Sequence, residues 1–131
     1  MNMKRLGDNK GIGLLEVLVS MIVLAIGLLG LAPLVVTSIE GNIIARDHTV
    51  ASNLVKHKVE YFQGLDALPT MPYREAETNV QDGFDRVSRI DDHVSDSTVP
   101  DGLYLLDVQV SWIDNQQIER TTAYSTFILK D

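Results

Sequence analysis

A long uncharged segment constrains this chain more than any other feature of its sequence. No Asp, Glu, Lys or Arg occurs among the 23 residues from Val17 to Ile39, and most of them are Leu, Val, Ile, Ala or Gly. A helix of that length, at about 1.5 Å per residue, measures roughly 35 Å and can cross a hydrocarbon core of about 30 Å. The segment therefore predicts a membrane-spanning helix and excludes an ordinary soluble globular protein.

The remainder of the chain is polar and acidic. The protein has 131 residues, with 18 Asp+Glu, 11 Lys+Arg, a formal charge of −7 and no Cys. Chains of this length usually form one domain. Without Cys there is neither a disulfide-stapled fold nor a zinc–thiolate site. The acidic balance argues against a nucleic-acid partner, since phosphate backbones are bound mainly by Lys and Arg.

The charges that flank the apolar segment predict its direction in the membrane. Lys4, Arg5 and Lys10 outweigh Asp8, which gives the N-terminal end a net charge of +2 (three minus one), and the first charge after the segment is Glu40. By the positive-inside rule the N-terminus stays cytoplasmic, and residues from about Glu40 onward are exported.

A cleaved secretory signal peptide is the alternative interpretation of the same segment. Its apolar core usually has 7–15 residues, which is shorter than the segment found here. The sequence Val36-Thr37-Ser38 is a weak match to a signal-peptidase site. A carboxylate such as that of Glu16, near the head of the segment, costs about 2.5–3.5 kcal/mol on insertion scales. An uncleaved span explains the length but not Glu16.

Glu16 belongs to a longer pattern. Residues 10–20 read Lys-Gly-Ile-Gly-Leu-Leu-Glu-Val-Leu-Val-Ser, and the pattern extends through the apolar segment to about Pro33. This pattern resembles the class III signal of type IV pilins and type II secretion pseudopilins. In that family a short basic leader ends in Gly, an apolar residue follows, and a Glu comes four residues later. Ile12 stands where Phe or Met is usual, and Gly13 where Thr or Ser is common.

The resemblance implies a processing step and an assembly role for Glu16. A prepilin peptidase would cut between Gly11 and Ile12 on the cytoplasmic face and would methylate the new amine of Ile12. A carboxylate in lipid or in a filament core needs a partner, and the Ile12 ammonium of the same or a neighbouring chain is the nearest cation. In the family this contact is thought to set the subunit register. The alternative is a Glu that merely snorkels to the membrane interface.

Helical periodicity continues beyond the membrane segment. No Pro lies between Pro33 and Pro69, so one helix from Ile12 to about Leu65 is expected, with 54 residues and a length of roughly 80 Å. Apolar residues recur at steps of three, four or seven, which predicts an amphipathic second half. They are Ile43, Ile44, Val50, Ala51, Leu54, Val55, Tyr61, Phe62 and Leu65.

Gly27, Gly30 and Pro33 mark the softest part of the predicted helix. Proline removes a backbone hydrogen bond, and small residues allow helices to approach closely in lipid. One interpretation is a kink or partial unwinding when the subunit moves from the bilayer into a filament, as relatives suggest. The other is that Gly and Pro are simply common in membrane helices.

The C-terminal half predicts a small antiparallel sheet. Residues 66–82 are expected to form a loop, residues 83–91 a strand and residues 91–102 an acidic loop. Tyr104–Trp112 alternates apolar and polar residues, and Ile118–Leu129 is rich in Thr, Tyr, Phe and Ile; both predict strands. The Tyr104–Trp112 face is expected to pack on the amphipathic helix.

The predicted fold class is therefore α+β: a long N-terminal helix packed against a small antiparallel β-sheet. The predicted division is a leader over residues 1–11, a transmembrane and filament-core helix over 12–39, an amphipathic helix half over 40–65 and a sheet with loops over 66–131.

Catalytic and metal-binding patterns are weak, and we expect a non-enzymatic protein without metal or cofactor. His48 and His57 are nine residues apart, unlike a metal-binding pair at i and i+4. A calcium site around His93 in the acidic loop is an alternative that the spacing does not favour, since nothing there matches an EF-hand loop. No phosphate-binding Gly loop or nucleophile elbow is present.

The resemblance is greatest to minor pilin V or pseudopilin I type subunits, which are thought to prime assembly near the filament tip. The lack of a Cys pair also differs from many major pilins. The expected partners are prepilin peptidase, other pilin or pseudopilin subunits, the inner-membrane assembly machinery and membrane lipid. The expected location is the bacterial inner membrane, with a periplasmic C-terminal part, and then a pilus or pseudopilus. Alternatives are a single-span periplasmic adaptor that does not polymerise and a membrane-anchored enzyme that uses the acidic loop.

Overall fold

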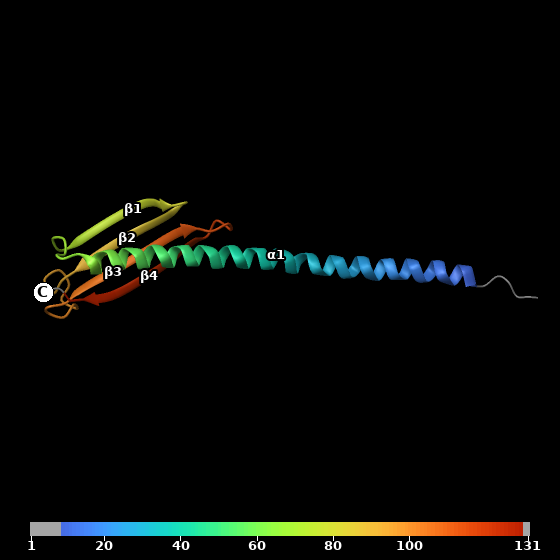
Figure 1. Cartoon of the computed structure of the whole chain (residues 1–131), viewed down its shortest axis with the longest axis horizontal. Coiled ribbons are helices and arrows are strands. Elements are labelled where there is room, and N and C mark those ends of the chain that lie inside the picture. The colour runs from blue at the N-terminus through green and yellow to red at the C-terminus, as the bar shows by residue number, and fades with distance from the viewer. Residues whose placement is uncertain (1–8, 130–131) are drawn as a thin grey trace, which may run out of the picture. The chain divides into compact units, whose positions relative to one another are not determined.

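One helix and four strands make up the described part of the chain. The computed structural model describes residues 9–129, with side chains from Gly13 onward. Figure 1 shows the helix and strands in chain order, and the chain divides after Asn42 into two compact units. The elements are α1 (Asn9–Gly64), β1 (Tyr73–Gln81), β2 (Phe84–Asp91), β3 (Tyr104–Ile113) and β4 (Glu119–Ile128). This α+β arrangement confirms the predicted fold class.

The first unit contains the apolar part of α1. The helix is continuous through Gly27, Gly30 and Pro33. Because proline has no N–H, the bond to the preceding turn is missing there, and the Thr37 hydroxyl donates to the Pro33 carbonyl oxygen at 2.9 Å. Every residue from 13 to 39 is exposed in the single chain. The most apolar window has a mean hydropathy of 2.6 and is long enough to cross a membrane.

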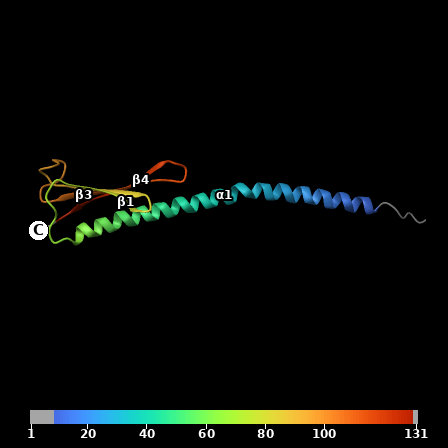
Figure 2. The same ribbon diagram turned by 90° about the horizontal axis from the view of Figure 1, so that it is seen from above.

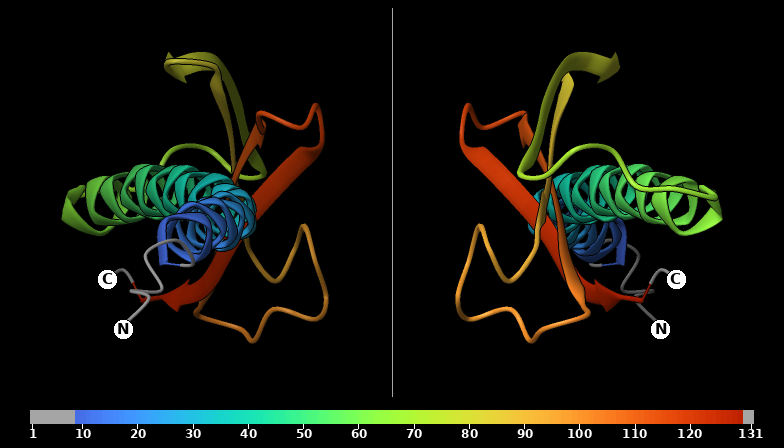
Figure 3. Two further views of the ribbon diagram at one scale, coloured as in Figure 1. Left: turned by 90° about the vertical axis from the view of Figure 1, so that its right-hand side faces the viewer. Right: turned by 90° about the vertical axis from the view of Figure 1, so that its left-hand side faces the viewer.

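The second unit contains a four-stranded antiparallel sheet in the order β1-β2-β3-β4. Asp82 and Gly83, with φ of 41° and 89°, connect β1 to β2, which suits the two-residue turn of a hairpin. Residues 43–64 of α1 lie along one face of this sheet (Figure 2). Figure 3 shows the residue 92–103 loop, in orange, standing away from α1.

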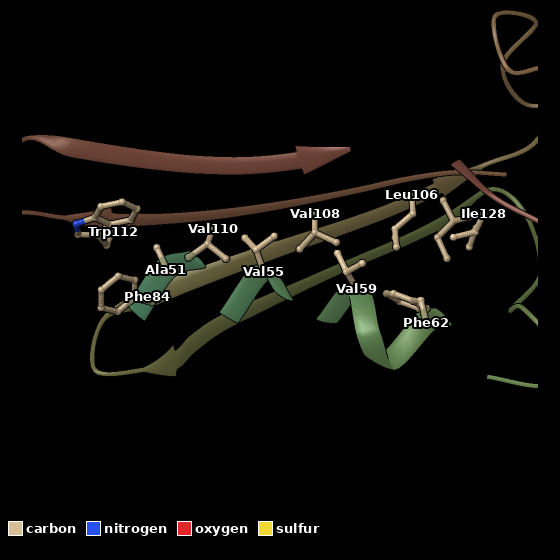
Figure 4. Close-up of a cluster of buried hydrophobic side chains, with 11 residues drawn as sticks. Ala51, Val55, Val59, Phe62, Phe84, Leu106, Val108, Val110, Trp112 and Ile128 are labelled. Atoms are coloured by element: carbon tan, nitrogen blue, oxygen red, sulfur yellow. The ribbon is translucent and has the colours of Figure 1, made fainter. Parts of the chain in front are cut away.

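A single apolar core joins α1 to the sheet. Every second residue of β3 faces the helix, as the pleat of a strand requires. Figure 4 shows these side chains meeting those of the helix. The helix contributes Ala51, Val55, Val59 and Phe62, β3 contributes Leu106, Val108, Val110 and Trp112, and Phe84, Ile90 and Ile128 complete the core. The predicted packing of the Tyr104–Trp112 face on the amphipathic helix is confirmed.

Two details of the predicted architecture are wrong. Residues 73–81 form β1, although residues 66–82 were expected to be a loop. The helix-facing positions of β1 hold Tyr73, Glu75 and Glu77, so the usual alternation of apolar residues is missing. Tyr61 and Ile43 were assigned to the apolar stripe of the helix, yet they are 53% and 36% exposed.

A cluster of charged side chains replaces apolar packing beneath β1. Lys58, on α1, is buried and contacts Glu75 and, at 3.0 Å, Glu77. The Arg86 guanidinium, also buried, donates to both carboxylate oxygens of Glu77 at 2.7 and 2.9 Å and to the Leu54 carbonyl oxygen at 3.1 Å. Each buried cation therefore has a carboxylate partner, which burial of a charge requires.

This cluster predicts acid-sensitive stability. Hydrogen bonds from Arg86, followed by those from Lys58, lower the pKa of Glu77 to about 2 from its ordinary 4.5. The unfolded chain takes up the proton first, so the stabilisation is complete above about pH 4.5 and is lost as the pH falls toward 2. After allowance for partial exposure, we expect a loss of roughly 1–2 kcal/mol between about pH 6 and about pH 3, because pH 3 still lies above the pKa of Glu77 in the folded protein.

The measurement is the free energy of unfolding of the full chain in detergent at about pH 6 and about pH 3. Glu77→Gln should be less stable near neutral pH and should lose less stability on acidification. Glu119→Gln, at an exposed strand end, is the matched control and should behave like the unmodified protein. Equal acid sensitivity of Glu77→Gln and the unmodified protein would contradict the assignment.

Candidate functional site

The candidate site is the N-terminal part of α1 around Glu16. Glu16 is the one charged residue between residues 13 and 39, and it is exposed in the single chain. Among the described residues, no Lys, Arg or His side chain forms an ion pair with its carboxylate. A cation for Glu16 must therefore come from outside the described side chains of this chain.

The surroundings of Glu16 are apolar. Val17, Ser20, Met21 and Leu24 line a shallow depression together with Glu16 on one side of the helix. Residues four apart share a helix face, so Glu16, Ser20 and Leu24 form one line along α1. A helix docking along this line would meet one carboxylate among mainly apolar side chains.

The predicted processing point lies one helical turn before Glu16. Gly11 and Ile12 belong to the first turns of α1, and the step of four positions from Ile12 to Glu16 corresponds to a rise of about 6 Å. Ile12 and Glu16 thus share a helix face. The side chain of Ile12 and the leader residues 1–8 lie outside the described part of the structure. The cleavage between Gly11 and Ile12 stays a prediction.

The predicted kink residues lie farther along the same helix. A Cβ atom added at Gly27 or Gly30 would have no other atom within 4 Å, so both glycines leave open space on the helix surface. Such positions allow a second helix to approach closely in lipid. The structure does not bring Gly27, Gly30 or Pro33 together with Glu16, and their role in bending stays a prediction.

His48 and the acidic loop have structural contacts. The His48 ring meets the edge of Trp112, with ring centroids 5.1 Å apart. Asp92 accepts hydrogen bonds from the hydroxyl and the N–H of Ser95, which hold the pKa of its carboxyl below the usual range. Within residues 9–129, no group of three His, Cys, Asp or Glu side chains is placed to hold a metal ion.

The sequence did not indicate a groove on the second unit. This groove has a volume of about 440 Å³ and lies between α1 and β4. It is lined by Ser52, Val55, Lys56, Val59, Glu60, Gln63, Thr122, Ala123 and Tyr124. The uncharged character of residues 121–129 was the available signal, but only the strand order shows that β4 is an edge strand.

One comparison with known proteins identifies the N-terminal pattern. Residues 7–32 match the prokaryotic N-terminal methylation motif, which includes Gly11, Ile12 and Glu16. No curated protein and no solved structure matches the chain. The N-terminal part of the protein therefore carries a class III prepilin signal, and this supports a place in the type IV pilin and pseudopilin family.

Proposed function

We propose that the protein is a minor pilin-like, or pseudopilin, structural subunit of a type IV pilus or a secretion pseudopilus. Prepilin peptidase removes residues 1–11 and methylates the amine of Ile12. The observation that carries the proposal is the lone carboxylate of Glu16, placed one turn after the cleavage point on an exposed apolar helix. The role is structural rather than enzymatic.

The apolar part of α1 serves two environments in this proposal. All residues from 13 to 39 are exposed in the single chain, and an apolar surface of this extent needs lipid or other helices to cover it. The bilayer covers it before assembly, and neighbouring subunits cover it in the filament. In both environments the cost of a charged Glu16 is relieved when a cation pairs with it.

The Ile12 ammonium is the proposed partner of Glu16. Cleavage after Gly11 creates a positive charge on the same helix face, one turn away. In the filament, the Ile12 amine of one subunit and Glu16 of its neighbour can pair and fix the axial register of two helices. The inner-membrane assembly machinery supplies subunits to the growing end.

A minor, tip-proximal role is the finer part of the proposal. The N-terminal pattern is most similar to that of minor pilin V and pseudopilin I type subunits, and the chain contains no Cys with which to close a C-terminal disulfide loop. We place the protein in the bacterial inner membrane, with its N-terminus in the cytoplasm and its sheet in the periplasm, before it enters the pilus or pseudopilus.

The mature N-terminus tests the processing step. We expect mass spectrometry of the membrane-extracted protein to find N-methylated Ile12 as its first residue. Gly11→Val should leave mainly precursor, because the branched side chain alters the residue at the scissile bond. Gly13→Ala, with open space around the added carbon, is the control and should be processed normally. A protein that retains Met1 would contradict the proposed route.

A further inference from the structure

Strand β4 has one open edge. It pairs with β3 over ten consecutive residues without a break and has no neighbour on its other side within the described chain. The Asp114 N–H donates to the Ile118 carbonyl oxygen at 2.9 Å. Since the residues of an antiparallel strand alternate between its two sides, every second position from Ile118 bonds to β3. The N–H and C=O groups of Thr121, Ala123, Ser125 and Phe127 consequently face the open edge.

This edge lacks the features that usually prevent strands from pairing. Natural proteins protect open edges with charges, prolines or bulges. Residues 121–129 contain neither a charged residue nor a proline, in a chain with a net charge of −7. Three large apolar side chains at or beside the edge are exposed: Tyr124 by 52%, Phe127 by 52% and Leu129 by 68%.

The opposite edge of the sheet is protected. The register of β1 shifts between Glu77 and Gln81, where a bulge or irregularity interrupts the ladder. Asn79 in this stretch has a φ of 50°, which a flat strand does not adopt. Arg74 adds an exposed charge near the start of β1. The fold thus closes one edge to strand pairing and leaves the β4 edge available.

The groove beside β4 indicates what an added strand would carry. Val55 and Val59 from α1 and Tyr124 from β4 line it. The part of its lining that α1 contributes also includes the exposed ion pair between Lys56 and Glu60, whose charged atoms are 3.7 Å apart. A strand that pairs with β4 places every second side chain on the helix side of the sheet. Those side chains would enter the groove, where apolar residues are favoured.

We propose that the open edge of β4 binds an extended strand from a different subunit of the same assembly. This strand is uncharged over the paired region and has an apolar side chain at every second position. The interaction rests on the proposed function, because it requires the exported sheet to meet other subunits. It adds a fifth strand to the sheet and fills the groove.

A second copy of this chain fits the edge less well. Two-fold pairing of β4 with β4 of a copy is antiparallel, so it reverses residues 43–64 of α1 in the copy. Copies anchored in one membrane instead share one direction. Pairing β4 with β1 of a copy meets the bulged stretch between Glu77 and Gln81. These two geometries favour a different polypeptide as the occupant.

Photo-crosslinking in cells that contain the native assembly genes tests the proposal. A benzophenone amino acid replaces Thr121, an exposed edge position, and the matched control replaces Gln109, which is exposed on the adjacent strand β3. We expect the Thr121 probe to form an adduct that the Gln109 probe does not. Mass spectrometry should assign its peptide to a strand of another protein that carries an N-terminal methylation motif.

Edge variants give the second arm of the test. Ala123→Lys places a charge on the edge, and Ala123→Pro removes an N–H that the pairing with β3 does not use. The loss of two or three backbone hydrogen bonds predicts a drop in adduct yield of roughly tenfold to a hundredfold. Gln109→Lys, which introduces the same charge on the ladder neighbour of Ala123, should leave the yield unchanged.

The outcomes separate the two proposals. Ala123→Lys should retain a methylated Ile12, because position 123 takes no part in processing. Properly processed protein with equal adducts at positions 121 and 109, or with an adduct to its own chain, would overturn the edge proposal alone. An undiminished yield in Ala123→Lys would do the same. Unprocessed protein with intact Met1 would instead contradict the proposed function.

Discussion

Glu16→Ala is expected to keep the protein in the membrane and to exclude it from the filament. Removal of the carboxylate makes insertion of the helix easier, by at most about 2.5–3.5 kcal/mol, which is the cost of a charge at the centre of a membrane helix, so anchoring should not suffer. The Ile12 ammonium of a neighbouring subunit then loses its partner, and an unpaired charge in an apolar environment disfavours docking. The measurement is the ratio of this protein in sheared filaments to that in membranes, which should fall by about tenfold or more, equivalent to about 1.4 kcal/mol.

Two variants define the cause of that loss. Glu16→Gln preserves the size and polarity of the side chain but not its charge, and it should fail as Glu16→Ala does. Ser20→Ala alters the next polar side chain in the same depression and should be incorporated normally. If Glu16→Ala entered filaments at the normal level, the single-span adaptor would become the better interpretation.

Phe62→Ala is expected to destabilise the second unit by about 3–5 kcal/mol. The Phe62 side chain is 1% exposed, and its ring contacts that of Tyr73 edge-on, with centroids 5.5 Å apart. The Lys58 ammonium lies 5.4 Å from the same ring centroid. The substitution therefore leaves a cavity at the point where the helix, β1 and the charged cluster meet.

Chemical denaturation of the full chain in detergent, followed by fluorescence of the single Trp112, measures this effect. Tyr61→Ala is the matched control, because Tyr61 is the adjacent aromatic residue and is 53% exposed. We expect it to cost less than about 1 kcal/mol. Similar losses of unfolding free energy for the two variants would show that the burial of Phe62 does not stabilise the core.

Local patterns in the sequence predicted the parts of the fold that depend on apolar periodicity. The long helix and the strands β3 and β4 follow from such patterns. Strand β1 does not, because its helix-facing positions hold Glu75 and Glu77, whose burial depends on Lys58 and Arg86. Lys58 is contributed by another element and Arg86 by the next strand. A window of neighbouring residues cannot show that pairing.

The functional features also differ in how far the sequence predicts them. Gly11, Ile12 and Glu16 lie within six residues of one another, so a short motif is enough to identify them. The β4 groove combines residues about 60 positions apart, such as Val59 and Thr122. To predict this groove, one must know that β4 is an edge strand and that α1 packs beside it. Neither follows from the composition of the chain.

The core position of Ala51, Val55, Val59 and Phe62 limits where the chain could be cut so that the second unit stays intact. A protease that cuts C-terminal to Phe62 would separate all four of these core residues from the sheet and so destabilise the fragment that contains it. A cut between Glu40 and Ala51 would instead leave every helical core residue attached to the sheet, with a short N-terminal helical extension.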